Sequence, residues 1–153
     1  MDFLDSRTLW GWVTLVLRIL LGLVFVYAAW LKLREPWAMF AIAIGSYQAL
    51  PLWAAEVVAR TLPWFELLLG LVLIAGAWRR VSTVTTSVLL TVFFALMIRA
   101  IVKGLEIDCG CFGPGERISW VTLLRDGALL ATSLLLTALA FRSRGLGAVA
   151  PRR

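Results

Sequence analysis

The chain of 153 residues contains no histidine. Histidine is the commonest general base, the commonest metal ligand and the usual ligand of haem iron. Its absence excludes catalysis by a Ser-His-Asp or Cys-His arrangement and zinc sites of the Cys2His2 type. Any chemistry therefore has to use cysteine, carboxylates, arginine, lysine, aromatic residues or a bound cofactor.

Acidic residues are also scarce: nine Asp and Glu stand against fifteen Lys and Arg, which gives a formal net charge of +6. A nucleic-acid site would need these charges in a basic stripe with interleaved aromatic residues. They lie instead mainly at the ends of apolar runs and in the C-terminal tail, where they orient a membrane protein. We therefore expect no nucleic-acid partner.

Apolar residues are abundant, at 61% of the chain, and the mean hydropathy is +0.91. A soluble domain is normally about half apolar, so the lipid bilayer must cover the excess. Four runs are long enough to cross a membrane, at about residues 10–31, 52–78, 81–102 and 120–141. The first is longer than the apolar region of a signal peptide and no small-residue cleavage site follows, so we expect it to be retained.

A shorter apolar run, Trp37 to Leu50, lies between the polar break Lys32–Pro36 and Pro51. A helix needs about 20 residues to cross the hydrocarbon core, so this run predicts a short interfacial or re-entrant helix. The fold class we predict is an all-α polytopic membrane four-helix bundle. Residues 1–141 form a single transmembrane domain with a cysteine loop at 104–118, and residues 142–153 form a basic cytoplasmic tail.

The distribution of Lys and Arg indicates the orientation. The side that carries both termini holds seven of them, Arg7, Arg79, Arg80, Arg142, Arg144, Arg152 and Arg153, and the opposite side holds four, Lys32, Arg34, Lys103 and Arg117. Because cytoplasmic loops carry the excess of positive charge, we expect both termini in the cytoplasm. The cysteine loop then faces the oxidising side, where disulfides persist.

Cys109 and Cys111 are the only cysteines, and one glycine separates them. A disulfide between them requires a tight turn, which Gly110 permits. So small a ring gains little entropic stabilisation and carries strain, and strained disulfides tend to be labile and catalytic. The spacing favours redox exchange with a partner thiol. Two alternatives stay open: incidental thiols, or a soft-metal site for an ion such as Cu(I), although the loop has no histidine or methionine to complete its shell.

Several ionisable residues fall inside the predicted spans, where they are costly and usually pair in the bundle interior. Five are expected to gather in the outer half, beneath the cysteine loop: Glu56, Arg60, Arg99, Arg125 and Asp126. Glu56 and Arg60 are four residues apart on one helix face, so they can pair. A rise of about 1.5 Å per residue puts Arg18 and Glu66 about one turn apart in depth, which predicts an intramembrane pair.

These charges have two interpretations. They can simply lock the bundle together, or the outer group can stabilise a cysteine thiolate, bind a quinone headgroup or relay a proton. The residues alone do not choose between these roles.

Four stretches resemble a known family. Leu17-Arg18-Ile-Leu-Leu-Gly22, with Ala29 and Lys32-Leu33, resembles the first helix of the DoxX-like membrane proteins. The segments Leu62–Gly70, Asp108–Gly113 and Leu124–Asp126 resemble the MauE branch of that superfamily. The resemblance covers about Leu15 to Leu136, and Cys-Gly-Cys-Phe-Gly is its most specific part.

The resemblance implies a four-helix protein of the bacterial inner membrane. It also implies a role in maturing the disulfide-rich small (β) subunit of periplasmic methylamine dehydrogenase, together with a thioredoxin-like periplasmic partner. Only Cys109 and Cys111 carry over as site residues. Four-helix oxidants of the DsbB and vitamin K epoxide reductase kind suggest quinone as an electron acceptor, but they use two cysteine pairs and this chain has one.

The leading hypothesis is a membrane component of a thiol–disulfide redox or maturation pathway, in which Cys109 and Cys111 exchange with the thioredoxin-fold partner. The alternative is a non-enzymatic assembly or anchoring subunit whose loop docks a partner. A small transporter or Cu(I)-handling protein is a third class, against which the absence of inverted repeats and broken helices weighs.

Overall fold

The computed structural model describes the backbone of residues 3–105, 107–110 and 117–142, and the side chains of these residues from Leu9 onward. This part of the chain forms five helices and no strand. They are α1 (Phe3–Arg34), α2 (Trp37–Ser46), α3 (Leu52–Ala75), α4 (Arg79–Val102) and α5 (Trp120–Arg142). All but α2 contain a segment long and apolar enough to cross a membrane. The predicted all-α membrane bundle, with a short helix between its first two spans, is confirmed.

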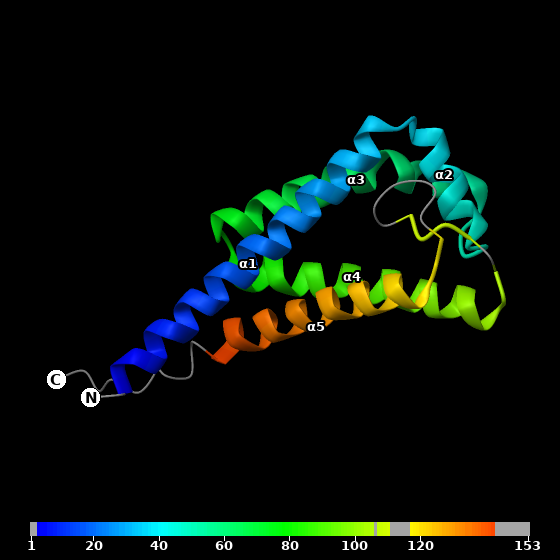
Figure 1. The fold of residues 1–153 in the computed structure, drawn as a ribbon. Coiled ribbons are helices and arrows are strands. Elements are labelled where there is room, and N and C mark those ends of the chain that lie inside the picture. Colours follow the sequence, from blue (N-terminus) through cyan, green and yellow to red (C-terminus); the bar gives the residue numbers. More distant parts are fainter. Residues whose placement is uncertain (1–2, 106, 111–116, 143–153) are drawn as a thin grey trace.

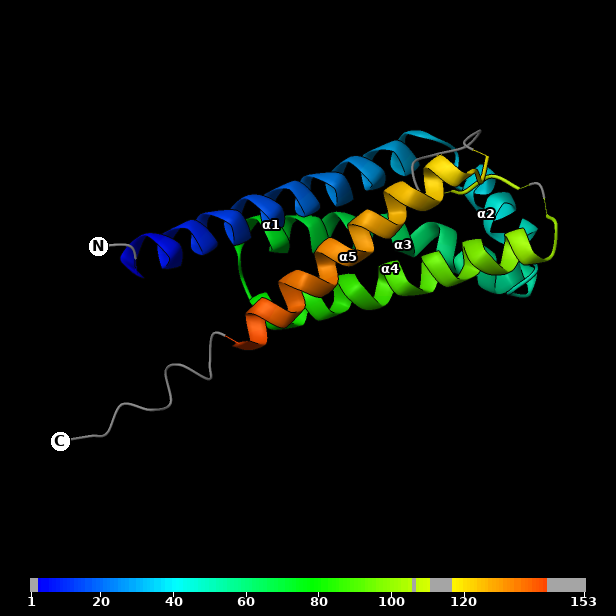
Figure 2. The ribbon, with the colours of Figure 1, turned by 60° about the horizontal axis from the view of Figure 1, so that its bottom comes forward.

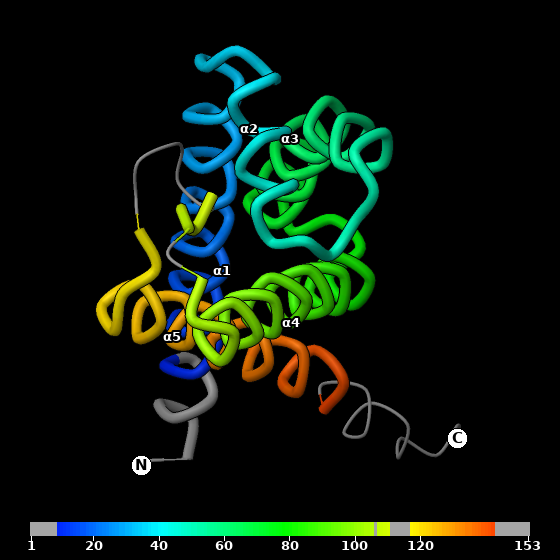
Figure 3. The backbone as a smooth tube through the Cα atoms, turned by 90° about the vertical axis from the view of Figure 1, so that its right-hand side faces the viewer, coloured from blue at the N-terminus to red at the C-terminus, as the bar shows by residue number. Residues whose placement is uncertain are grey.

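The helices form two packed groups, which Figure 1 shows as an upper and a lower layer. Helix α1 packs chiefly against α3, and α4 packs chiefly against α5. Viewed along the bundle in Figure 3, α2 lies beside α3 at the end that carries the cysteine loop. Leu21, Phe25, Leu69, Leu73 and Leu136 form the buried core between the two layers.

Two glycines bring α1 and α3 into backbone contact. A Cβ on Gly22 would lie 2.8 Å from the carbonyl oxygen of Gly70, and a Cβ on Gly70 would lie 2.8 Å from that of Gly22. Small residues allow this approach, which is a common basis of helix pairing in membranes. Because Gly22 meets Gly70 and Arg18 meets Gly76, the N-terminal turns of α3 extend beyond the end of α1. Helix α2 covers them, with Phe40 and Ala41 packed on Ala59.

Hydroxyl groups join the other pair of helices. The Ser87 hydroxyl on α4 donates a hydrogen bond to Ser133 on α5 (3.1 Å) and lies 3.0 Å from the hydroxyl of Thr137. Interhelical hydrogen bonds of this kind stabilise membrane bundles where the hydrophobic effect contributes little.

The helix boundaries depart from the predicted spans in two places. The predicted break at Lys32 is wrong, because α1 continues through Lys32 to Arg34 and ends before Pro36. The second span ends at Ala75, because Gly76 adopts the left-handed conformation that commonly ends a helix. Ser119 caps the start of the last span: the backbone N–H of Thr122 donates to the Ser119 hydroxyl at 3.3 Å.

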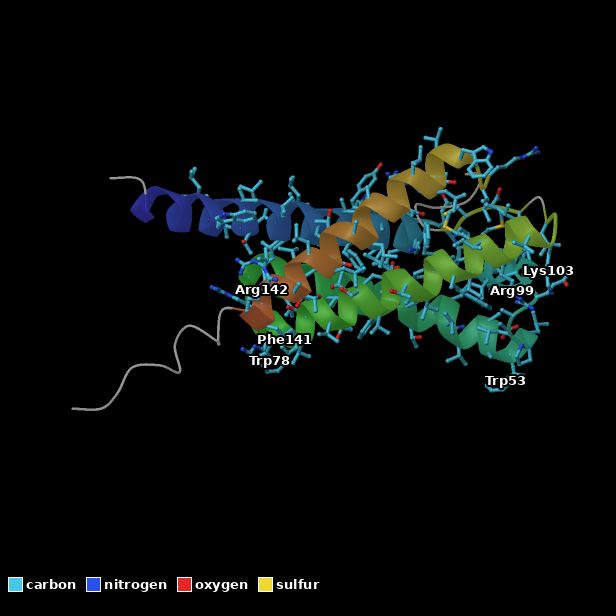
Figure 4. The ribbon with its side chains drawn as sticks, turned by 90° about the horizontal axis from the view of Figure 1, so that it is seen from below. Trp53, Trp78, Arg99, Lys103, Phe141 and Arg142 are labelled. Atoms are coloured by element: carbon cyan, nitrogen blue, oxygen red, sulfur yellow. The ribbon has the colours of Figure 1, made fainter. Side chains whose placement is uncertain are left out.

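The two ends of the bundle carry different residues. Figure 4 shows Trp53, Arg99 and Lys103 at the end of the bundle where the cysteine loop lies, and Trp78, Phe141 and Arg142 at the opposite end. Trp53 and Trp78 are 71% and 80% exposed, as expected of tryptophans at a membrane interface.

Candidate functional site

Cys109 is buried, with only 1% of its surface exposed. It lies between α4 and α5 in a segment whose two arms are joined by a hydrogen bond from the Ile118 N–H to the Ile107 carbonyl (3.1 Å). Gly110 follows it with φ +69°, a conformation that suits glycine. Cys111 lies outside the described residues, so the structure does not test the predicted pairing of the two cysteines.

Helices on three sides surround the sulfur and backbone of Cys109. Its Sγ lies 3.7 Å from Oδ2 of Asp126 on α5 and 3.8 Å from Sδ of Met97 on α4. The hydroxyl of Tyr47, at the end of α2, donates to the Cys109 carbonyl at 2.8 Å. The segment that holds Cys109 is therefore fixed by contacts from α2, α4 and α5.

Asp126 connects this cysteine to the surface of the bundle. The carboxylate is buried, at 6% exposure, and its Oδ1 accepts a hydrogen bond from the Arg125 Nε at 3.1 Å. Arg125 is about one third exposed. One carboxylate oxygen thus faces a guanidinium and the other faces the thiol, an arrangement that lets Asp126 exchange a proton with Cys109.

Glu66 has a different partner from the one expected. Lys32 Nζ binds both of its carboxylate oxygens, at 2.8 and 2.7 Å, and both side chains are at least 95% buried. Side chains lean toward the N-terminus of their helix. Lys32 on α1 and Glu66 on the antiparallel α3 therefore lean toward each other. Arg18 leans away from Glu66, and its guanidinium packs against Gly76.

The outer charged group assembles only in part. Asp126 and Arg125 lie together at Cys109, and Arg99 is linked to them indirectly, since it donates to the carbonyl of Tyr47 at 3.4 Å. Arg60 lies over the ring of Trp37, 3.9 Å from its centroid. The described residues include no ion pair between Arg60 and Glu56, so that expected pair is wrong. The cation–π contact with Trp37 takes its place.

A small cavity of about 40 Å³ connects the two buried carboxylates. Lys32, Glu66 and Asp126 line it, and aromatic residues including Phe93 and Phe94 form its wall. A water molecule needs roughly 10–15 Å³ of such space, so the cavity has room for about three waters. A cavity that admits a benzene ring measures about 150 Å³. A quinone ring is therefore too large for this space.

Two features of the site escaped the sequence reasoning. Lys32 was assigned to the polar break Lys32–Pro36, and Met97 was not among the candidate site residues. The helical spacing of Lys32 with Phe25, Ala28 and Ala29, all buried, could have indicated that Lys32 faces inward.

The sequence was compared with known families and proteins. A model of the family described as "Methylamine utilisation protein MauE" matches residues 10–139. The chain belongs to the MauE family.

Two curated members of this family are among the relatives. The "Methylamine utilization protein MauE" of Paracoccus denitrificans is 36% identical over 98% of this chain and 76% of its own length. The protein of the same name from Methylorubrum extorquens is 29% identical over 76% of this chain, which spans 64% of that relative. No solved structure matches the chain.

Removing the lysine of the buried pair should destabilise the fold strongly. We expect Lys32→Met to lower the free energy of unfolding by about 3–5 kcal/mol, because it leaves Glu66 buried without its counter-ion. The double variant Lys32→Met/Glu66→Leu should recover most of this loss. Reversible unfolding in mixed detergent micelles, followed by circular dichroism, measures the effect, with Arg34→Met as the control at an exposed position. A double variant as unstable as the single one would contradict the pairing.

Proposed function

We propose that this MauE-family chain is a membrane component of a thiol–disulfide pathway. In it Cys109 and Cys111 exchange a disulfide with a thioredoxin-fold periplasmic partner, and the pathway matures the small subunit of methylamine dehydrogenase. The observation that carries the proposal is the buried contact between Cys109 Sγ and Asp126 Oδ2 at 3.7 Å. The printed names of the two relatives, both methylamine utilisation proteins, support the pathway.

The exchange begins from a Cys109–Cys111 disulfide. A thiol of the partner loses its proton and attacks the sulfur of Cys111 as a thiolate, and the bond to Cys109 breaks. Cys109 leaves as a thiolate and takes up one proton in place of the one that the partner thiol lost, with the Asp126 carboxylate as the relay. The second partner thiol then attacks the mixed disulfide and releases Cys111. The partner ends as a disulfide, and the two cysteines end as a dithiol. The burial of Cys109 is our reason for assigning the mixed disulfide to Cys111.

The reduced pair must be reoxidised by an acceptor with which it can exchange two electrons. A second disulfide protein fits the proposal, and a membrane quinone that contacts the outside of the bundle is the other candidate. In either case two protons leave the dithiol. Asp126 accepts the one from Cys109, and waters in the 40 Å³ cavity can carry it toward Glu66 and Lys32.

We further propose the location: the bacterial inner membrane, with both termini cytoplasmic and Cys109 near the periplasmic face. Helices α1 and α5 place both described ends of the chain on the same side of the bundle, as four spans require (Figure 1). Lys32 is buried and paired, so it no longer counts among the outer loop charges. Without Lys32, the side of the membrane that carries both termini has a larger excess of Lys and Arg over the opposite side.

The sulfur pair of Cys109 and Met97 favours a second candidate function, the handling of Cu(I). Metal–sulfur bonds are about 2.3 Å long, so two sulfurs 3.8 Å apart can bind one ion. Thioether and thiolate are the ligands that Cu(I) prefers. The loop itself contains no methionine that could bind the ion, as expected, but Met97 on α4 lies next to Cys109.

The identity of the attacking cysteine can be tested by trapping. We expect Cys109→Ser to accumulate a mixed disulfide with a thioredoxin-fold partner whose second cysteine is replaced by serine, because neither protein then keeps a thiol that resolves the bond to Cys111. Cys111→Ser should accumulate little. Non-reducing electrophoresis and mass spectrometry of cells quenched with acid identify the adduct. A double variant that still supports maturation of the client would exclude the proposed chemistry.

Replacing the buried carboxylate should slow the exchange. We expect Asp126→Asn to lower the rate at which a small dithiol reduces the oxidised protein by about 10²-fold, the usual contribution of a positioned proton donor. Glu56→Gln is the matched control, since that carboxylate has no recorded contact with Cys109. Equal slowing in both variants would reject the role of Asp126.

Copper analysis separates the two candidate functions. The redox proposal expects less than stoichiometric copper in protein purified under reducing conditions, and unchanged exchange kinetics in Met97→Leu. One tightly bound Cu(I) per chain that is lost in Met97→Leu would favour the metal function instead.

A further inference from the structure

A groove of about 1020 Å³ lies at the end of the bundle opposite to Cys109, between the start of α1, the start of α4 and the end of α5. Its volume is at the upper end of the range for small-molecule pockets. Four arginines line it, Arg18, Arg79, Arg80 and Arg142, and the lining residues of the described chain include no Asp or Glu. The part of the groove formed by described side chains is therefore strongly positive, and it contains no counter-charge.

The innermost of these arginines has hydrogen-bonding capacity that the protein does not use. Arg18 packs its guanidinium against Gly76, and its Nε is buried with no hydrogen-bond partner. Buried N–H groups are normally satisfied, so an orphaned one suggests an acceptor from outside the chain. Arg80 is different: its Nε donates to the carbonyl of Ala140 at 3.3 Å, and its guanidinium lies 5.2 Å from the centroid of Phe141. The side chain of Arg80 is thus held by contacts within the protein, whereas the Nε–H of Arg18 has no acceptor among the described residues.

The groove also continues into an apolar surface. Arg18 is level with Gly76, at the end of α3, so the first turns of α1 extend beyond the α3–α4 turn, as Figure 2 shows. Leu15, Leu136 and Leu139 line the groove next to the arginines. Further along α1, on the bilayer side of Arg18, Leu20 is 54% exposed and Leu23 is 51% exposed. A ligand that covers all of this needs an anionic head and an apolar tail.

We propose that this groove binds an anionic phospholipid. Its phosphate is held by Arg18, Arg79 and Arg142, and its acyl chains lie along the apolar face of α1. Guanidinium groups bind phosphate oxygens through paired, charge-assisted hydrogen bonds. Basic pockets between transmembrane helices are a known form of lipid headgroup site. This site is independent of the thiol chemistry, since it lies at the far end of the bundle.

Native mass spectrometry of the full chain in a neutral detergent tests the proposal. Phosphatidylglycerol and phosphatidylcholine with identical acyl chains are titrated separately, and glycerol phosphate serves as the headgroup without chains. We expect one saturable phosphatidylglycerol site. Phosphatidylcholine should bind at least about tenfold more weakly, because its choline ammonium cancels the charge of the phosphate and is repelled by the arginines of the groove. Glycerol phosphate should not bind in the same range.

Two variants locate the site. Arg18→Gln should weaken phosphatidylglycerol binding about tenfold. The double variant Arg79→Gln/Arg142→Gln, whose side chains are exposed, should do the same without disturbing the fold. Arg34→Gln removes an exposed arginine at the opposite end and should leave binding unchanged. Thermal unfolding in detergent checks that each variant is folded.

Three results would overturn the proposal. Equal affinity for the two lipids would show that charge does not select the ligand. Equal weakening by Arg34→Gln and by the groove variants would show that only net charge matters. Binding of glycerol phosphate as tight as that of the lipid would assign the groove to a free anion and not to a phospholipid.

Discussion

The buried ion pair between Lys32 and Glu66 is the constraint on which the rest of the bundle depends. An ammonium and a carboxylate inside a membrane bundle are tolerated only when they neutralise each other, since either one alone is very costly at that depth. Both oxygens of Glu66 are bound by Lys32, and the rings of Phe40 and Phe93 lie 5.3 and 5.8 Å from its Nζ. The pair thus holds α1 against α3, and α2 and α4 contact it through Phe40 and Phe93.

This pair also defines the polar interior beneath the cysteine. Asp126 shares a water-sized cavity with it and contacts Cys109 on its other side. The Cys109 thiol, the Asp126 carboxylate and the Lys32–Glu66 ion pair therefore follow one another through the interior of the bundle, which is otherwise apolar. Among the described residues, the arginines at the opposite end have no carboxylate partner, and they line an open groove. The chain's charges are divided between an internal set, matched by one another, and a terminal set that faces outward.

The spans and the short helix could be predicted because length and hydropathy determine which segments cross a membrane. The partner of Glu66 could not, because depth along a helix says nothing about the direction in which a side chain leans. A lysine four residues before a proline also resembles an interfacial residue. Helices α1 and α3 are also staggered along the bundle axis, and a depth calculated from a uniform rise per residue does not include this stagger.

Met97 has no sequence signal at all: only the packing of α4 against the Cys109 segment brings its sulfur to the thiol. Asp126 was found because a carboxylate inside an apolar span is conspicuous.

The central claim is that Cys109 and Cys111 cycle between a dithiol and a disulfide. Differential alkylation of both cysteines in acid-quenched intact cells, read by mass spectrometry, measures it most directly. The account predicts a mixture of the two states, which shifts toward the dithiol when a reduced thioredoxin-fold partner accumulates and returns when the partner is oxidised. Two cysteines that stay in one state at every ratio of reduced to oxidised partner would contradict it.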